Sequence, residues 1–232
     1  SIAFFNSNDI YPISADSTLP FDQHRDIFYL SGIDQEESLL VLFPDSKDIE
    51  YKEMLFIRET NEYITHWEGE KLTKEQAKNI SGINNIFWIG EFEDILKEVL
   101  SQADFVYINT NEHYRQNVQT QTREDRFINR LKNINGLKFK KSNPILQKQR
   151  SVKDQIEIEL IKNACEITKK GFERVLTFIK PGVWEYEIEA EFSHEFLRNR
   201  SRRFAYTPII ASGRNSNFLH YVYNNKQCLD GE

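Results

Sequence analysis

The segment SVKDQIEIELIKNACEITKKGFERVLTFI, residues 151–179, carries the longest helical pattern in the chain and divides it into two parts. Its apolar residues recur at helical spacing, which predicts a helix with one buried stripe. Ser151 and Asp154, three residues apart, form a variant of the capping box that marks a helix start. The sequence Lys-Pro-Gly follows at 180–182, where proline and glycine stop the helix. Cys165 falls on the apolar face, and we expect it to be a small buried side chain.

Before this helix, short apolar runs alternate with helical patterns. Six runs rich in β-branched and aromatic residues predict strands at 2–5, 38–43, 53–58, 86–89, 104–109 and 137–141. Helices are predicted at 73–80, 91–102 and 123–134, the first with Thr73 as its N-cap. Such alternation predicts an α/β domain in which helices cover a central sheet.

A change of pattern at residues 140–150 marks the expected domain boundary. The segment is polar, and Pro144 interrupts regular structure. We therefore divide the chain into residues 1–146 and 147–232.

The second domain is expected to continue from the long helix into another helix and a new sheet. Apolar residues at every fourth position indicate the second helix: Trp184, Ile188, Phe192 and Phe196. The runs FAYTPIIASG (204–213) and LHYVYNN (219–225) are interpreted as strands of this second sheet. This arrangement is typical of the opening part of a domain.

Composition excludes several classes of protein. The 232 residues carry a net charge of −6 with no clustered basic patch, so nucleic acid is not expected as a partner. No apolar run approaches the ~20 residues that span a bilayer, and SIAFFNSNDI at the start has no basic region typical of a signal peptide. Two distant cysteines predict neither a disulfide framework nor a zinc knuckle. These features favour a reduced, cytoplasmic protein.

Most candidate site residues have a structural interpretation. His194-Glu195 begins like a zinc-binding HExxH helix, but position 198 is arginine, so the motif is absent. His24 lies in FDQHRDIFYLSG (21–32), interpreted as an aromatic-rich strand, where it could form a pocket rim. The favoured alternative is a loop whose polar residues anchor the start of the strand. Trp67 and Gly69 are interpreted as a bulky anchor and a turn residue.

His220, in SGRNSNFLHYVYNN (212–225), is the strongest catalytic candidate. In a strand, Leu219 and Tyr221 would share one face and His220 would point to the other. A neutral imidazole beside the turn at Gly213 could donate a hydrogen bond to an oxyanion or shuttle a proton. A core histidine bonded to backbone remains the alternative at this point.

Several motifs, taken together and in this order, resemble the Xaa-Pro aminopeptidase and prolidase family. The matching segments are FDQHRDIFYLSGID (21–34), LLVLFPD (39–45), WEGEKLTKEQA (67–77), RSVKDQIEIELIKNACEIT (150–168), IKPGVWEYEIEAEF (179–192), and ASGRNSNFLHY (211–221) followed by LDGE (229–232). One departure is Ser201, where the family usually has glycine; it affects only a turn.

The resemblance implies a fold, a reaction and a role for His220. The expected fold is α/β: a creatinase-type amino-terminal domain, with a mixed sheet flanked by helices, followed by the first part of an α+β pita-bread catalytic domain. Family members hydrolyse the bond before a proline in second position, using two divalent metal ions, here expected to be manganese. The ligands of these ions are expected beyond Glu232, so the segment alone is expected to be inactive. His220 is expected to face the substrate beside the metals.

The resemblance also leaves alternatives open. Some relatives are prolidase-type dipeptidases or creatinase-like hydrolases, and pita-bread proteins without metal ligands act as binding modules. A peptide substrate and a homo-oligomer, dimer or tetramer, are expected, without nucleic acid or membrane partners.

Overall fold

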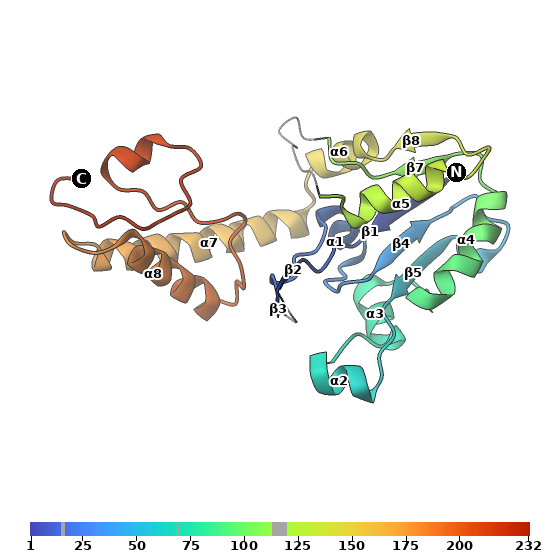
Figure 1. The fold of residues 1–232 in the computed structure, drawn as a ribbon, viewed down its shortest axis with the longest axis horizontal. Helices are drawn as coiled ribbons and strands as arrows, with labels where there is room; N and C mark the ends of the chain where they lie inside the picture. Colours follow the sequence, from blue (N-terminus) through green and yellow to red (C-terminus); the bar gives the residue numbers. More distant parts are fainter. Residues whose placement is uncertain (15–16, 69, 113–119) are drawn as a thin grey trace. The chain divides into compact units, whose positions relative to one another are not determined.

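A computed structural model describes residues 1–14, 17–68, 70–112 and 120–232. The chain forms two compact units, residues 1–151 and 152–232 (Figure 1). The domain boundary expected at 146/147 lies within helix α6 (Asn143–Ser151) and stays a prediction. Within the described ranges, none of the helices combines the length and apolar character that a membrane span requires.

The first unit is built on a mixed sheet of six strands in the order β6-β5-β4-β1-β7-β8 (Figure 1). Its strands are β1 (Ile2–Asn6), β4 (Leu39–Leu42), β5 (Glu53–Ile57), β6 (Asn85–Trp88), β7 (Val106–Ile108) and β8 (Phe139–Lys141). Only β4 runs antiparallel to its neighbours, with Phe4 of β1 opposite Val41. The β1–β7, β7–β8 and β5–β6 pairs are parallel. The six predicted strands are therefore confirmed; a separate hairpin pairs β2 (Pro12–Ser14) with β3 (Ser17–Thr18).

Helices cover both faces of this sheet, which explains why its strands are apolar on both sides. The unit's helices are α1 (Arg25–Ser31), α2 (Glu62–Glu68), α3 (Lys74–Ser81), α4 (Phe92–Ser101), α5 (Arg123–Lys132) and α6, with 3₁₀ turns η1 (Ile49–Tyr51) and η2 (Ile89–Glu91). Phe4 packs among residues of α4 and α5 on one face. Phe5 packs with residues of α1, α3 and α6 on the other. The expected α/β fold with a mixed, helix-flanked sheet is confirmed.

The N-cap expected at Thr73 is present. The Thr73 side chain accepts a hydrogen bond from the backbone of Gln76, and the Gln76 side chain accepts one from the backbone of Thr73. This reciprocal pair satisfies donors that a helix start leaves without partners. The three helices predicted in this part of the chain are confirmed as α3, α4 and α5.

The strand interpretation of residues 21–32 is wrong, because Arg25–Ser31 forms helix α1. His24 caps this helix: its Nδ1 accepts a hydrogen bond from the backbone N–H of Asp26 (3.3 Å). Gly32 ends it in the left-handed region at a φ of +69°, donating its N–H to the Phe28 carbonyl (2.8 Å). Aromatic residues favour a strand locally, but capping at both ends and burial of Ile27 favour the helix.

The segment around Pro144 is helical, contrary to the interruption expected there. Pro144 is the second residue of α6, within a first turn whose N–H groups have no intrahelical partner. Proline is therefore tolerated at this position, and Leu146 of the same helix is buried against the sheet.

The second unit contains helices α7 (Gln155–Phe178) and α8 (Glu185–Arg198). Helix α7 begins after Asp154, which forms a capping box with Glu157, so Ser151 is not its cap. Gly171 allows close approach of α8, since a Cβ there would lie 2.8 Å from Cδ1 of Phe192.

The expectation of a fully buried stripe on α7 is wrong. Gly171 and Val175 are its buried residues, whereas Leu160 is 64% exposed and Cys165 is also exposed. Helix α8 covers only the carboxyl-terminal part of the stripe, so the remaining apolar side chains have solvent on that face.

The strands expected at 204–213 and 219–225 are not formed. The 3₁₀ turn η3 (Gly213–Asn217) lies between these segments, and an isolated bridge between Trp184 and Gln227 is the pairing seen in the described part of this unit. A strand is stable only when a neighbour accepts its backbone hydrogen bonds. Here side chains take that place; the Ile210 N–H, for example, donates to Oδ1 of Asn224 (2.9 Å).

Candidate functional site

The centre of the second unit is a buried carboxylate at the start of α8. Glu185 is the first residue of the helix, and its side chain is completely buried. The preceding turn places it there, with Gly182 at a φ of +93°, a conformation that favours glycine. The Glu185 N–H donates to the carbonyl of Lys226 (2.9 Å), which ties the helix start to the carboxyl-terminal segment.

Four donors surround the Glu185 carboxylate. Oε1 accepts from the Ser212 N–H (2.7 Å) and hydroxyl (2.9 Å). Oε2 accepts from the Tyr221 hydroxyl (2.7 Å) and the Lys226 N–H (3.0 Å). Burial acts to raise the pKa of Glu185, but these hydrogen bonds from Tyr221, Lys226 and Ser212 outweigh it and lower the pKa. The group is therefore an anion at neutral pH.

His220 lies on the segment that these hydrogen bonds hold. It follows η3 in a turn, directly before Tyr221, and its side chain is exposed. The ring therefore does not lie in a core of this structure, and its catalytic role stays a prediction. The strand alternation expected around it is absent, because residues 219 and 220 form a turn.

A second tie fixes the same segment farther along. Asn224 is buried at a positive φ of 47°, which asparagine tolerates better than most residues. Its Nδ2 donates to Oε2 of Glu189 (2.7 Å) and to the Pro208 carbonyl (3.0 Å). Helix α8 therefore holds the segment at both Glu185 and Glu189.

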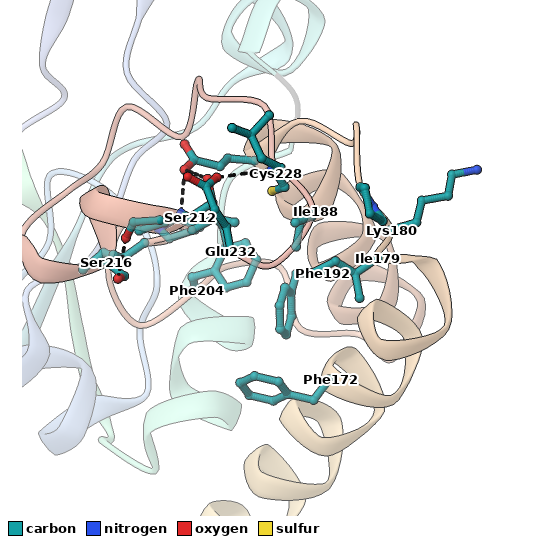
Figure 2. Close-up of a pocket in the computed structure, with 18 of the residues that line it drawn as sticks. Phe172, Ile179, Lys180, Ile188, Phe192, Phe204, Ser212, Ser216, Cys228 and Glu232 are labelled. Atoms are coloured by element: carbon teal, nitrogen blue, oxygen red, sulfur yellow. Dashed lines mark hydrogen bonds between the residues drawn. The ribbon is translucent and has the colours of Figure 1, made fainter.

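A cavity of about 1000 Å³ opens beside this segment (Figure 2). Its apolar wall comes from aromatic residues of α7, α8 and the following segment: Phe172, Phe192, Phe196 and Phe204. Its polar lining includes Glu185, Ser212 and Glu232. The cavity can accept an apolar group with few polar contacts, which is typical of a small-molecule or peptide pocket.

The carboxylates and histidines that the structure describes do not form a metal site by themselves. Over the described ranges, no group of three or more His, Cys, Asp or Glu side chains is placed to hold an ion. Zinc or manganese needs such a convergent set of ligands. The residues in these ranges therefore do not fit a complete metal centre.

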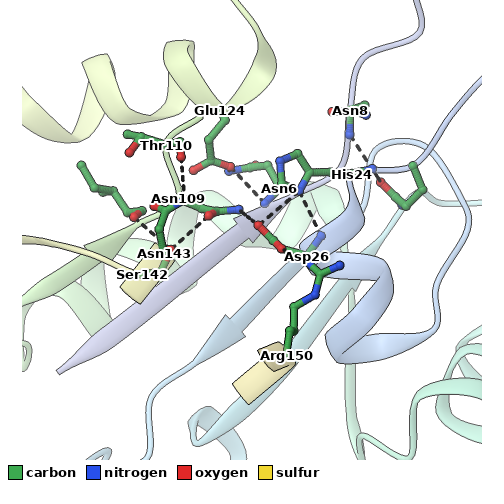
Figure 3. A network of polar contacts seen from close by, with 12 residues as sticks. Asn6, Asn8, His24, Asp26, Asn109, Thr110, Glu124, Ser142, Asn143 and Arg150 are labelled. Carbon is green, nitrogen blue, oxygen red and sulfur yellow. Dashed lines mark hydrogen bonds and ion pairs between the residues drawn. The ribbon is translucent and has the colours of Figure 1, made fainter. Parts of the chain in front are cut away.

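His24 belongs to a separate polar network in the first unit (Figure 3). Asp26 accepts hydrogen bonds from Nδ2 of Asn109 (2.9 Å) and Nη1 of Arg150 (2.7 Å). The Ser142 hydroxyl donates to Oδ1 of Asn109 (3.1 Å). Burial lowers the pKa of His24, although Asp26 opposes the shift. As the N-cap of α1, His24 has the anchoring role that the sequence favoured.

The asparagine and serine members of this network were not identified from the sequence, although a signal was present. Asn6 ends β1, Asn109 directly follows β7, and Ser142 directly follows β8. These strands are parallel neighbours, so their carboxyl ends meet at one edge of the sheet. Polar residues immediately after buried strands therefore predict such a cluster.

Glu124 of α5 joins this edge and carries a shifted pKa. Its Oε2 accepts from the side chain (3.0 Å) and the backbone (3.2 Å) of Asn6. Burial raises the pKa of Glu124 to about 7, against the opposing hydrogen bonds from Asn6. A carboxyl whose pKa is higher in the folded state binds more protons there, so stability falls as the pH rises from about 4.5 to 7.

Glu124→Gln is expected to remove this pH dependence. A rise of the pKa from 4.5 to about 7 lowers the unfolding free energy by about 3 kcal/mol above pH 7. Below pH 4.5 this loss of stability does not occur. Relative to wild type, the variant should therefore gain unfolding free energy between pH 4.5 and pH 8, measured by urea denaturation. Glu75→Gln, at an exposed first-turn position of α3, is the control and should follow the wild type. Parallel curves for Glu124→Gln and wild type would contradict the prediction.

Two residues singled out from the sequence fall outside what the structure describes. Gly69 and the side chain of Trp67 lie outside the described residues. The roles expected for them stay predictions.

Comparison with known proteins follows the division into two units. Residues 1–107 match the family model of the aminopeptidase P N-terminal domain, and residues 159–232 match that of metallopeptidase family M24. The Xaa-Pro aminopeptidase of Haemophilus influenzae is 29% identical over 217 residues, 94% of this chain and 48% of the relative. That of Escherichia coli is 29% identical over 221 residues, 94% of this chain and 50% of the relative.

A solved structure gives the same result. Zinc-substituted E. coli aminopeptidase P in complex with product matches 99% of this chain and 52% of that chain, with a TM-score of 0.82 and 27% sequence identity. The chain spans about half the length of the curated relatives that it matches. The M24 model covers the motifs that surround His220, and the aminopeptidase P model covers the motifs at 21–34, 39–45 and 67–77. Residues 1–107 therefore belong to the family of aminopeptidase P N-terminal domains, and residues 159–232 belong to metallopeptidase family M24.

Proposed function

We propose that the full-length protein containing this chain is an Xaa-Pro aminopeptidase. It hydrolyses the bond before a proline in second position and releases the amino-terminal residue. The observation that carries this proposal is the exposed His220 on a segment fixed by Glu185 through Tyr221, in a chain whose relatives are Xaa-Pro aminopeptidases. An exposed imidazole on an otherwise anchored segment is suited to contact a substrate.

His220 acts on the carbonyl oxygen of the scissile bond. When water adds to this carbonyl, negative charge develops on the oxygen, and a ring N–H placed beforehand stabilises that charge without rearrangement. The leaving proline nitrogen is a tertiary amide nitrogen with no N–H, so it must receive a proton as it departs. His220 is assigned the oxyanion contact, not this protonation.

The full-length enzyme uses two divalent ions, which we take to be manganese. Membership of a metallopeptidase family and the zinc-substituted neighbour support a divalent metal. The ligands are assigned to sequence beyond Glu232, because this chain spans about half the length of its relatives.

The proposal extends to domains, partners and location. Residues 1–146 form the amino-terminal domain, and residues 147–232 belong to the catalytic domain. The protein acts in the cytoplasm, which agrees with two cysteines that form no disulfide, and takes peptides as substrates. It assembles as a homo-oligomer, a dimer or tetramer.

A peptide panel tests the function. The full-length protein, reconstituted with Mn²⁺, is expected to cleave Xaa-Pro-Yaa tripeptides before proline and to leave matched Xaa-Ala-Yaa peptides intact. Metal analysis of the same preparation should find about two ions per chain. Cleavage of Xaa-Pro dipeptides alone would identify a prolidase, and inactivity on both peptides with metal bound would favour a binding module.

A further inference from the structure

We propose that Glu185 is the positioning residue for His220: its buried carboxylate holds the Ser212–Lys226 segment so that the exposed imidazole keeps one orientation towards the substrate. The inference rests on the proposed function. Glu185 belongs to the PGVWEYE stretch (181–187), to which the sequence assigned no chemical role.

The contacts of Glu185 bracket His220 along the chain. Ser212 precedes the histidine by eight residues, Tyr221 follows it immediately, and Lys226 lies six residues beyond it. All three donate to the one carboxylate, at distances of 2.7 to 3.0 Å. The Glu185 carboxylate therefore holds the segment that carries His220 at both of its ends and at the residue next to the histidine.

The segment depends on this anchor because it lacks the usual backbone support. Within the described residues, this segment contains the 3₁₀ turn η3 but no strand, and the isolated bridge of Gln227 comes directly after it. A loop without a hydrogen-bond ladder keeps one conformation only where side chains fix it. Glu185 supplies that restraint from a rigid helix, which is the arrangement that holds a functional group precisely enough for chemistry.

A carboxylate suits this position better than an amide. An ionised carboxylate is an acceptor on both oxygens, whereas glutamine accepts on one atom and donates on the other. The amide N–H₂ of Glu185→Gln would face the Ser212 or Lys226 N–H, and a buried donor would lose its partner. This substitution changes no side-chain volume appreciably, so it tests the hydrogen bonds themselves.

A double-mutant cycle in the full-length protein tests the inference. Glu185→Gln is expected to lower kcat by about 10- to 100-fold with KM within about threefold, because a small displacement of a reacting group has effects of this size. In a His220→Ala background the same change should cost less than about threefold, since Glu185 acts through the missing ring. Equal losses in both backgrounds, or an unchanged kcat in the wild-type background, would overturn the proposal.

Matched variants separate positioning from a general loss of stability. Glu191→Gln makes the same change on α8 and breaks the ion pair with Arg174, away from the His220 segment; its kcat should stay within about twofold of wild type. Tyr221→Phe removes one of the four hydrogen bonds with a smaller risk to folding, and should lower kcat by about 3- to 10-fold. Wild-type turnover by Tyr221→Phe would count against the role of this contact and against the proposal.

Amide hydrogen exchange makes the two proposals distinguishable. Glu185→Gln should speed exchange across residues 212–226 by about tenfold or more relative to Glu191→Gln, whether or not the protein cleaves Xaa-Pro peptides. If the wild type is inactive but exchange accelerates, the proposed function fails and the anchoring by Glu185 holds. If exchange is unchanged, the anchoring fails whatever the activity.

Discussion

His220→Ala in the full-length protein is expected to lower kcat by roughly 10²- to 10³-fold. Loss of one preorganised donor to a developing oxyanion has this effect in other acyl-transfer enzymes, and it corresponds to about 3–4 kcal/mol. KM should change little, because the contact strengthens only as charge develops on the carbonyl oxygen. Steady-state kinetics with an Xaa-Pro-Yaa peptide would measure both constants.

Two controls make this result specific. His194→Ala removes an exposed histidine from α8 in the same unit, and its kcat should match wild type. The metal content of His220→Ala should be unchanged, since the ring is not assigned as a ligand. Normal turnover by His220→Ala would remove this residue from the mechanism.

Phe4→Ala is expected to lower the unfolding free energy by about 3–5 kcal/mol, the usual cost of removing a large aromatic side chain from a core. Phe4 is fully buried in the central strand β1. Its ring packs against those of Phe127 and Phe92, with centroids 5.1 Å and 6.3 Å away. The substitution would leave a cavity between the sheet and two helices. Urea denaturation of wild type and variant would measure the difference.

An aromatic residue on the surface of the same unit provides the control. Phe28 of α1 is 48% exposed, so Phe28→Ala should cost less than about 1 kcal/mol. Against a total stability of about 5–15 kcal/mol for a typical domain, Phe4→Ala removes a large fraction. Equal losses for the two variants would show that Phe4 does not lie at the centre of this core.

The sheet of the first unit was predictable because its strands are buried on both faces. The run at 53–58 is continuously apolar apart from its ends, and Met54, Leu55, Phe56 and Ile57 are all buried in β5. A strand buried on both faces is a continuous apolar run, and this run can be recognised in the sequence without knowing which strands pair with it. The helix starts at Thr73 and Thr122 also depend on nearby residues, because each threonine side chain accepts a hydrogen bond from the residue three positions later.

The errors arose where distant residues decided the conformation. Residues 204–213 and 219–225 have strand-like composition, but the Ser212 N–H donates to Glu185 of α8 and the Ile210 N–H donates to the side chain of Asn224. The stripe on α7 has helical spacing, yet spacing does not state how much of a helix its neighbours cover. The helix at Arg25–Ser31 contains aromatic residues typical of strands and depends on burial against the sheet.

The sequence by itself determined the six strands of the first sheet, the helices α3, α4, α5, α7 and α8, the family, and the identity of His220 as the candidate catalytic side chain. These depend on local spacing and on short motifs, which are properties of contiguous residues. Only the tertiary structure decided that Glu185, Ser212, Tyr221 and Lys226 meet around one carboxylate, because these residues are separated by up to 41 positions and come together through the packing of α8 against the carboxyl-terminal segment. The same holds for Glu124 and Asn6, 118 positions apart, whose burial at the sheet edge shifts a pKa that no local pattern reveals.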